Sequence, residues 1–408
     1  MSVKPGTPPY ETLAYMPQLD ALRAFAVGGV FFGHFWVTDA SGDSPLKIGD
    51  WGQWGVQLFF VLSGYLITGI LLKCRDHVET GYAGFRPVLL KFYGRRFLRL
   101  MPIYYLTLAV IIALTLLWNV FPGLVRNIGW YITYLQNFLL VAAGDEGTAY
   151  PCLHHFWTLA IEEQFYLLWA PVVLFVSRQW LIPVIVLLIL SVMPFRFVMV
   201  ALLHMDWSDA RLLTPSHFDT LGLGALLAVV QISAKDGHDK ASRLATWLLW
   251  PGLVLMACFV GGRAINLYVE GFPVKTGLLF LFGATASGMV FVWVIHKASR
   301  GFGGVVGIIL TWAPLIYLGK ISYGLYVYHL PVLYVLENEE HGLFQALGMA
   351  APQSGWLSML VYSGATIAVA MASWHLIERP LQRFKKYLRY QIPSEVAAAP
   401  RTTQPAGT

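Results

Sequence analysis

Apolar stretches long enough to cross a bilayer recur about ten times along this chain, and no other feature constrains its fold more strongly. A transmembrane helix needs about 20 mostly apolar residues to span roughly 30 Å of hydrocarbon. The chain is 57% hydrophobic and only 12% charged, whereas soluble domains are about 25% charged. We therefore predict an all-α, polytopic membrane helix bundle. The expected spans are residues 20–37, 55–73, 97–118, 156–176, 181–203, 216–233, 245–262, 276–296, 321–337 and 356–377.

Two other apolar stretches do not fit the pattern of a simple span. Residues 127–142 are short and carry polar side chains among the apolar ones, so we expect an interfacial or re-entrant segment there. Residues 303–318 are interrupted by glycines and by Pro314. Because glycine and proline break regular helices, the arrangement of this second stretch stays open.

The distribution of basic residues predicts the orientation of the bundle. With the N-terminus in the cytoplasm, most lysines and arginines fall in inner loops and near the C-terminus, as the positive-inside rule requires. The result is an N-in, C-in topology with an even number of spans. If residues 127–142 also crossed the bilayer, every later loop would invert and the bias would be lost. The expected outer loops hold few basic residues: Lys47, Arg126, Arg211, Arg263 and Lys275.

The pattern predicts one membrane domain with short flanking segments. We expect residues 1–18 to be a cytoplasmic N-terminal segment and residues 19–389 to be the membrane domain. Residues 390–408 are small, polar and Pro-rich, and should form a disordered cytoplasmic tail. The net charge of +6 does not indicate a nucleic-acid partner, since the basic residues lie at helix ends. The cysteines are widely spaced and are expected to be free thiols: Cys74, Cys152 and Cys258.

Ionisable residues inside the first span are the strongest indication of a functional site. A charge in the middle of a membrane helix costs about 2.5–3.5 kcal/mol on insertion scales. This span carries Asp20, Arg23 and His34. Arg23 and His34 are eleven positions apart, so they lie roughly 16 Å apart along the helix axis and near the same face. Taken singly, Arg23 could be a snorkelling anchor and His34 a hydrogen-bonded packing residue.

Arginines cluster where the third span begins. Arg96 and Arg99 share a helix face, and Arg95 lies beside them at the cytoplasmic rim. Guanidinium groups suit phosphate recognition, because their paired N–H groups match phosphate oxygens. Anchoring by the positive-inside rule is the alternative explanation for the same residues.

The fourth span carries two adjacent carboxylates, Glu162 and Glu163, between His155 and Tyr166. Neighbouring positions on a helix point in different directions, so we expect the two carboxylates to serve different partners. One would pair with an arginine of the bundle, and the other would orient a base. Which of them has which role stays open.

Two further polar residues, Asp219 and His329, also fall inside predicted spans. Buried polar side chains often join helices by hydrogen bonds. We therefore expect a structural role for each more readily than a chemical one.

Seven segments of the chain carry recognisable motifs: residues 19–23 with His34, 60–67, 93–102, 155–166, 218–219, 321–331 and 377–380. In this order they resemble the acyltransferase-3 family of bacterial integral membrane acyltransferases, which modify cell-surface sugars and related molecules. The resemblance runs from about residue 16 to residue 386. Members often carry a fused extracytoplasmic esterase-like domain, and we expect this chain to be the stand-alone form.

The resemblance implies an O-acyltransferase of the bacterial inner membrane. It would move an acyl group, acetyl by default, from cytoplasmic acyl-CoA to a hydroxyl of a carbohydrate or glycoside, such as a polysaccharide or lipopolysaccharide. The residues matching the catalytic pair are Arg23 and His34, and no metal is expected. His34 would act as a general base or carry the acyl group itself, and both mechanisms stay open.

The other candidate residues are given roles around this pair. Either of the adjacent glutamates would fix the imidazole tautomer or the acceptor. The expected CoA-binding residues are Arg95, Arg96 and Arg99, and the expected supporting residues are Asp20, His155, Tyr166, Asp219 and His329.

Other functions stay open on sequence alone. A transporter or flippase would also place charges inside the bundle as a relay, and a membrane scaffold is the third alternative. The absence of a detectable internal repeat and the arginine cluster favour the enzyme. The acyl group, the acceptor sugar and a homo-oligomeric state are not determined by the sequence.

Overall fold

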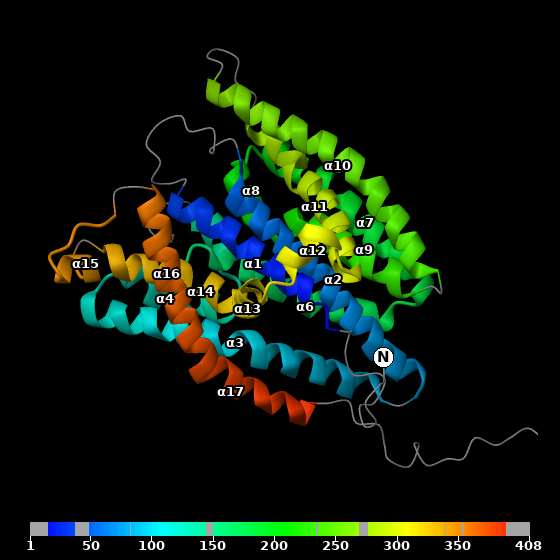
Figure 1. Cartoon of the computed structure of the whole chain (residues 1–408), viewed down its shortest axis with the longest axis horizontal. Coiled ribbons are helices and arrows are strands. Elements are labelled where there is room, and N and C mark those ends of the chain that lie inside the picture. The colour runs from blue at the N-terminus through cyan, green and yellow to red at the C-terminus, as the bar shows by residue number, and fades with distance from the viewer. Residues whose placement is uncertain are drawn as a thin grey trace, which may run out of the picture.

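The computed structural model describes residues 15–36, 49–81, 83–143, 150–233, 236–268, 276–338, 340–352 and 355–388. All the regular elements within these ranges are helices, so the predicted all-α class is confirmed (Figure 1). The predicted disordered tail and most of the predicted N-terminal segment lie outside the described residues.

Each predicted span falls on a helix. Seven helical stretches of the described residues are long and apolar enough to cross a membrane. They are α2 (Trp51–Glu79), α3 (Phe85–Trp118), α6 (Phe156–Phe175), α7 (Arg178–Phe197) with η3 (Val198–Leu202), α10 (Gly237–Tyr268), α11 (Thr276–Arg300), and α16 (Gly355–Ser373), which continues through η5 (Trp374–Glu378), α17 (Arg379–Gln382) and η6 (Arg383–Leu388).

The other three predicted spans correspond to shorter helices. They are α1 (Pro17–Phe31) with its π-helical extension η1 (Phe32–Trp36), α9 (Phe218–Ile232) and α14 (Ser322–Glu337). Most side chains of these helices are buried. These shorter, buried helices also carry the polar residues Arg23, Asp219 and His329.

The two doubtful stretches are broken helices. The first divides into α4 (Pro122–Ile132) and α5 (Gln136–Ala143), and Tyr134 between them has a φ of 56°. This break agrees with the prediction that residues 127–142 are not a full span. The second divides into α12 (Gly304–Leu310) and α13 (Ala313–Lys320). The remaining short helices are α8 (Trp207–Leu212), η4 (Thr214–His217) and α15 (Leu343–Ala346).

Helices α1, α2 and α6 form the middle of the bundle. In Figure 1, α7, α9, α10 and α11 lie on one side of them, and α3, α4, α14 and α16 lie on the other. Helix α2 packs closely along α9 and α1. A Cβ on Gly224 of α9 would lie 2.8 Å from the backbone nitrogen of Tyr65, so only glycine allows this approach. All three cysteines are free, as predicted.

Candidate active site

A polar cavity of about 80 Å³ lies where α1, α2, α3, α6 and α14 meet. Its lining includes Arg23 from α1, Arg96 and Arg99 from α3, and Glu162 and Tyr166 from α6. The structure therefore brings together residues from three distant segments of the sequence. Most of the remaining lining is apolar or aromatic, so the charged groups are concentrated in a small volume.

The three arginines form a cationic cluster. Arg23 Nη1 donates to Asp20 Oδ1 at 3.0 Å, one turn earlier on α1, which fixes the direction of its side chain. The guanidinium of Arg96 lies 5.6 Å from the centroid of the Tyr166 ring, a cation–π geometry. Arg99 is close enough to Arg23 and Arg96 for their charges to act on it. This concentration of positive charge suits an anionic ligand.

Arg95 does not line the cavity, although it was grouped with Arg96 and Arg99. Successive positions on a helix point about 100° apart, so three arginines within five positions cannot all face one side. The phosphate-binding role predicted for Arg95 therefore has no support from the cavity.

The two adjacent carboxylates point to different surroundings. Glu162 lines the cavity, and its Oε1 accepts a 2.6 Å hydrogen bond from Ser63 Oγ of α2. Ser63 Oγ in turn accepts from the hydroxyl of Tyr166 at 3.0 Å. Glu163 is not part of the lining and lies near Tyr134 and other tyrosines, where its charge acts on their hydroxyls. The different directions of the two side chains agree with the prediction.

Three histidines gather beside this cavity. The ring of His329 on α14 lies 5.2 Å from the ring of His34 on η1 and 4.4 Å from that of His155, between centroids. His329 and His155 are buried, and His34 is half-buried. Within the described residues, no group of three or more His, Cys, Asp or Glu is arranged to hold a metal.

Backbone contacts define the tautomers of two of these rings. His329 Nδ1 lies 2.5 Å from the carbonyl oxygen of Tyr326, and His155 Nε2 lies 3.2 Å from that of Val327. A carbonyl oxygen only accepts, so these nitrogens carry the protons. The opposite nitrogens, His329 Nε2 and His155 Nδ1, are buried and have no hydrogen-bond partner in the described part of the chain. Each neutral ring therefore has one free acceptor inside the bundle.

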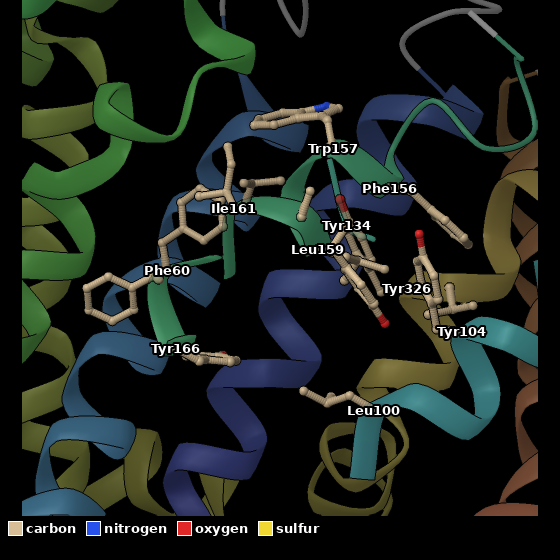
Figure 2. Packing of buried hydrophobic residues seen from close by; sticks show 14 of the residues in the cluster. Phe60, Leu100, Tyr104, Tyr134, Phe156, Trp157, Leu159, Ile161, Tyr166 and Tyr326 are labelled. Atoms are coloured by element: carbon tan, nitrogen blue, oxygen red, sulfur yellow. The ribbon is translucent and has the colours of Figure 1, made fainter. Parts of the chain in front are cut away.

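Tyr326 separates the cavity from the histidines. It lines the cavity together with Thr158, and the two hydroxyls are 2.6 Å apart. The same tyrosine ring lies 5.4 Å from both His155 and His329, between centroids. Figure 2 shows Tyr326 beside Tyr134 and Tyr104 at one side of the packed cluster, with Tyr166 at the opposite side.

Asp219 lies outside this site and has a structural environment, as the sequence led us to expect. Its Oδ2 accepts from Arg196 Nη2 at 2.8 Å and from Thr285 Oγ1 at 2.5 Å. Both members of the ion pair are fully buried. The ion pair and the Thr285 hydrogen bond join α7, α9 and α11, and they supply the buried carboxylate of Asp219 with hydrogen-bond donors.

Sequence reasoning missed several polar residues of the site. Ser63 is one hydroxyl within a long apolar run, and Thr158 and Tyr326 look like ordinary membrane-helix residues. Glu378 is also buried, accepts from Ser373 Oγ at 3.4 Å, and is close enough to Arg99 for their charges to interact. All four residues lie inside segments that match the family, which was the available signal: 60–67, 155–166, 321–331 and 377–380.

The fold and the site define a polytopic helical membrane protein with a cationic cavity and a histidine cluster inside its bundle. Residues 16–375 match the acyltransferase domain of the acyltransferase-3 family. This match covers most of the chain, so the chain belongs to that family.

Two characterised relatives are similar over nearly the whole chain. The peptidoglycan O-acetyltransferase OatA of Listeria monocytogenes is 28% identical over 396 residues, which cover 90% of this chain and 56% of that protein. The O-acetyltransferase OatA of Staphylococcus aureus is 28% identical over 385 residues, covering 90% of this chain and 57% of that protein. The chain thus spans a little more than half the length of these relatives. No solved structure matches.

Proposed function

We propose that this protein is a membrane O-acyltransferase that moves an acyl group, acetyl by default, from cytoplasmic acyl-CoA to a hydroxyl of a cell-surface or exported carbohydrate. The family membership and the two O-acetyltransferase relatives support this reaction class. The observation that carries the proposal is the adjacency of an arginine-lined cavity and a histidine cluster, with Tyr326 between them. The proposed location is the bacterial cytoplasmic membrane.

The arginine-lined cavity suits the anionic end of the donor. Guanidinium groups bind phosphate oxygens in paired hydrogen bonds, and the lining offers Arg96 and Arg99 beside Arg23. In the predicted N-in topology, Arg99 lies where the third span leaves the cytoplasmic side. The phosphates of CoA would therefore bind at the inner rim, and the thin pantetheine arm would carry the thioester between the helices toward His34.

The proposed general base is His34. As the acceptor oxygen attacks the thioester carbonyl carbon, the hydroxyl proton passes to the imidazole, the C–S bond breaks, and the proton then goes to the departing thiolate. In the covalent variant, His34 first displaces the thiol and the acceptor then takes the acyl group from the ring. Arg23 would stabilise the negative charge that develops on the carbonyl oxygen.

The neighbouring residues have proposed positioning roles. His329 offers its free Nε2 beside the His34 ring and would accept a hydrogen bond that fixes the ring during transfer. Of the two glutamates, Glu162 is the better candidate for a role at the donor, because it lines the cavity and Glu163 does not.

The test is transfer of labelled acetyl from acetyl-CoA to surface carbohydrate in membranes that contain His34→Ala. Loss of a general base lowers the rate by about 10²–10⁴-fold, so the variant should be nearly inactive while it still inserts and folds. The matched control is His375→Ala, because His375 is an exposed histidine that bonds the hydroxyl of Tyr317. A fully active His34→Ala variant would reject the proposed function.

A second measurement separates the enzyme from a transporter. The purified protein in detergent should bind acetyl-CoA, and Arg99→Gln should weaken that binding because the variant removes one charge from the cavity. A protein that transports carbohydrate without acyl transfer should show no such binding.

A further inference from the structure

A second and larger cavity, of about 320 Å³, lies near the first turns of α2. The start of α2, helix α8, the end of α10 and the start of α11 surround it. In the predicted topology all of these segments adjoin outer loops, so the cavity opens toward the extracytoplasmic side. Its volume falls within the range of small-molecule binding sites.

Several buried polar atoms of this cavity lack hydrogen-bond partners among the described residues. Gln57 is fully buried and lines the cavity, yet neither its Nε2 nor its Oε1 has a hydrogen-bond partner among the described residues. His217 also lines the cavity, and its Nε2 donates to the carbonyl oxygen of Arg211 at 2.8 Å. Its Nδ1 is left as an unpartnered acceptor. Buried polar groups are nearly always satisfied, so these atoms point to a ligand that offers both donors and acceptors.

Arg211 adds a positive charge, on which the carboxylate of Asp50 in the same lining acts. Its guanidinium lies 5.7 Å from the ring centroid of Trp157 and 5.5 Å from that of Trp207. Within the described residues it forms no ion pair, and its Nε is buried without a hydrogen-bond partner. The other charged groups of the lining, Arg263 and Asp50, face each other at 3.8 Å. The cavity therefore holds one cation more than it holds anions, which favours a ligand with a carboxylate.

The cavity also has aromatic walls and lies close to the histidine cluster. Trp54 and Trp207 offer flat apolar surfaces on which the apolar faces of a sugar ring can pack. Arg211 is close enough to His34 for its charge to act on that imidazole. For acyl transfer, a hydroxyl of a ligand bound here would have to reach His34 from the outer side.

We infer that the outer cavity is the acceptor site, and that its acceptor is an acidic carbohydrate whose carboxylate binds Arg211 and whose hydroxyls bond Gln57 and His217. This inference rests on the proposed function and adds to it the charge of the acceptor. Acyl transfer itself would proceed as described above, since the acidic group only orients the sugar.

The test compares two probes that differ by one carboxylate, methyl glucuronoside and methyl glucoside. Binding to the purified full-length protein is followed by tryptophan fluorescence, because two tryptophans line the cavity. We expect the glucuronoside to bind at least tenfold more tightly. Arg211→Gln should remove this preference, and Arg211→Lys should keep part of it. Arg126→Gln, at an exposed arginine of another outer loop, is the matched control and should bind as the unmodified protein does.

A second variant distinguishes loss of probe binding from loss of folded protein. Gln57→Leu should weaken both probes alike and leave thermal stability intact, because the amide it removes has no partner within the described protein. The inference is overturned if the two probes bind with equal affinity or if neither binds. It is also overturned if Arg211→Gln keeps the full preference for the glucuronoside.

The outcomes of the two proposals can be told apart. If the glucuronoside binds as expected but His34→Ala still transfers acetyl, the proposed mechanism fails and the carboxylate site stands. If His34→Ala is inactive but the cavity does not distinguish the probes, acyl transfer stands and the acidic acceptor is wrong.

Discussion

Replacing Asp219 by alanine is expected to destabilise the protein without changing the chemistry of the site. The ion pair of Asp219 with Arg196 is fully buried, with side-chain exposures of 1% and 0%. Breaking such a pair costs about 3–5 kcal/mol, because the remaining charge has neither a partner nor water. Arg196 would keep its bonds to the carbonyl oxygens of Leu281 and Ser216. We therefore expect the free energy of unfolding to fall by an amount near the lower end of that range, about 3 kcal/mol.

Two companion variants test the physical reason for that loss. Asp219→Asn keeps one carbonyl oxygen, which can still accept from the Thr220 amide but not also from Thr285 Oγ1, so it should cost less than alanine does. The double replacement Arg196→Met with Asp219→Leu removes both charges and should recover much of the stability.

The assay is thermal unfolding in detergent, together with acetyl transfer normalised to folded protein. The reasoning is refuted if Asp219→Ala unfolds at the same temperature as the unmodified protein. A variant that stays stable but loses transfer would instead assign Asp219 a chemical role.

Two further substitutions test the packing and the cavity. Gly224→Ala should lower the free energy of unfolding by about 1–3 kcal/mol, because the added Cβ would collide with the carbonyl oxygen of Val61. The control is Gly364→Ala, whose added Cβ would contact nothing, so it should be neutral or stabilising in the same unfolding assay. Ser63→Ala removes the hydroxyl that donates to Glu162. A hydrogen bond to a charged group contributes about 1.5 kcal/mol. If that energy is lost from the transition state, acetyl transfer should slow roughly tenfold. Transfer at the unmodified rate would show that this hydrogen bond does not position Glu162.

The positions of the helices could be predicted from the sequence, because the length and hydropathy of each apolar stretch indicate where a span lies. Residues 216–233 were expected to be a span, and α9 occupies Phe218–Ile232. What hydropathy does not report is whether a span is one straight helix. The break after Phe31, where α1 becomes the π-helical segment Phe32–Trp36, has no apolar or charge signal in the sequence.

The site could be predicted from the sequence only in part, because its residues come together through tertiary packing. Ionisable residues inside spans are costly, so Arg23, His34 and Glu162 could be singled out one by one. Their grouping depends on how α1, α3 and α6 pack against each other, so only the family resemblance, and not residue spacing, placed them at one site. Hydroxyl residues such as Ser63 cost little in a membrane helix and give no comparable signal.

Arg23 and His34 end in different parts of the site because roughly 16 Å of helix separates them along the axis, and the π-helical segment also changes the direction in which His34 points. A regular α-helix would place residues eleven apart near one face, but a π-helical turn contains more residues and rotates the chain less at each. Arg23 accordingly lines the cavity, whereas His34 contacts His329 beyond Tyr326. A Cβ on Gly33 would lie 2.9 Å from the backbone nitrogen of Gly52, so the π-helical segment is held against the start of α2.

The start of α2 also borders the outer cavity, through Gln53 and Trp54. The glycine contact between η1 and α2 therefore fixes the distance between the imidazole of His34 and the proposed acceptor. The same helix also lines the arginine-lined cavity, from Val56 to Ile67 and including Ser63. Because α2 is one continuous helix of 29 residues, it holds the proposed donor site and the proposed acceptor site at a constant separation. In the proposed mechanism, His34 is the group that both substrates must reach.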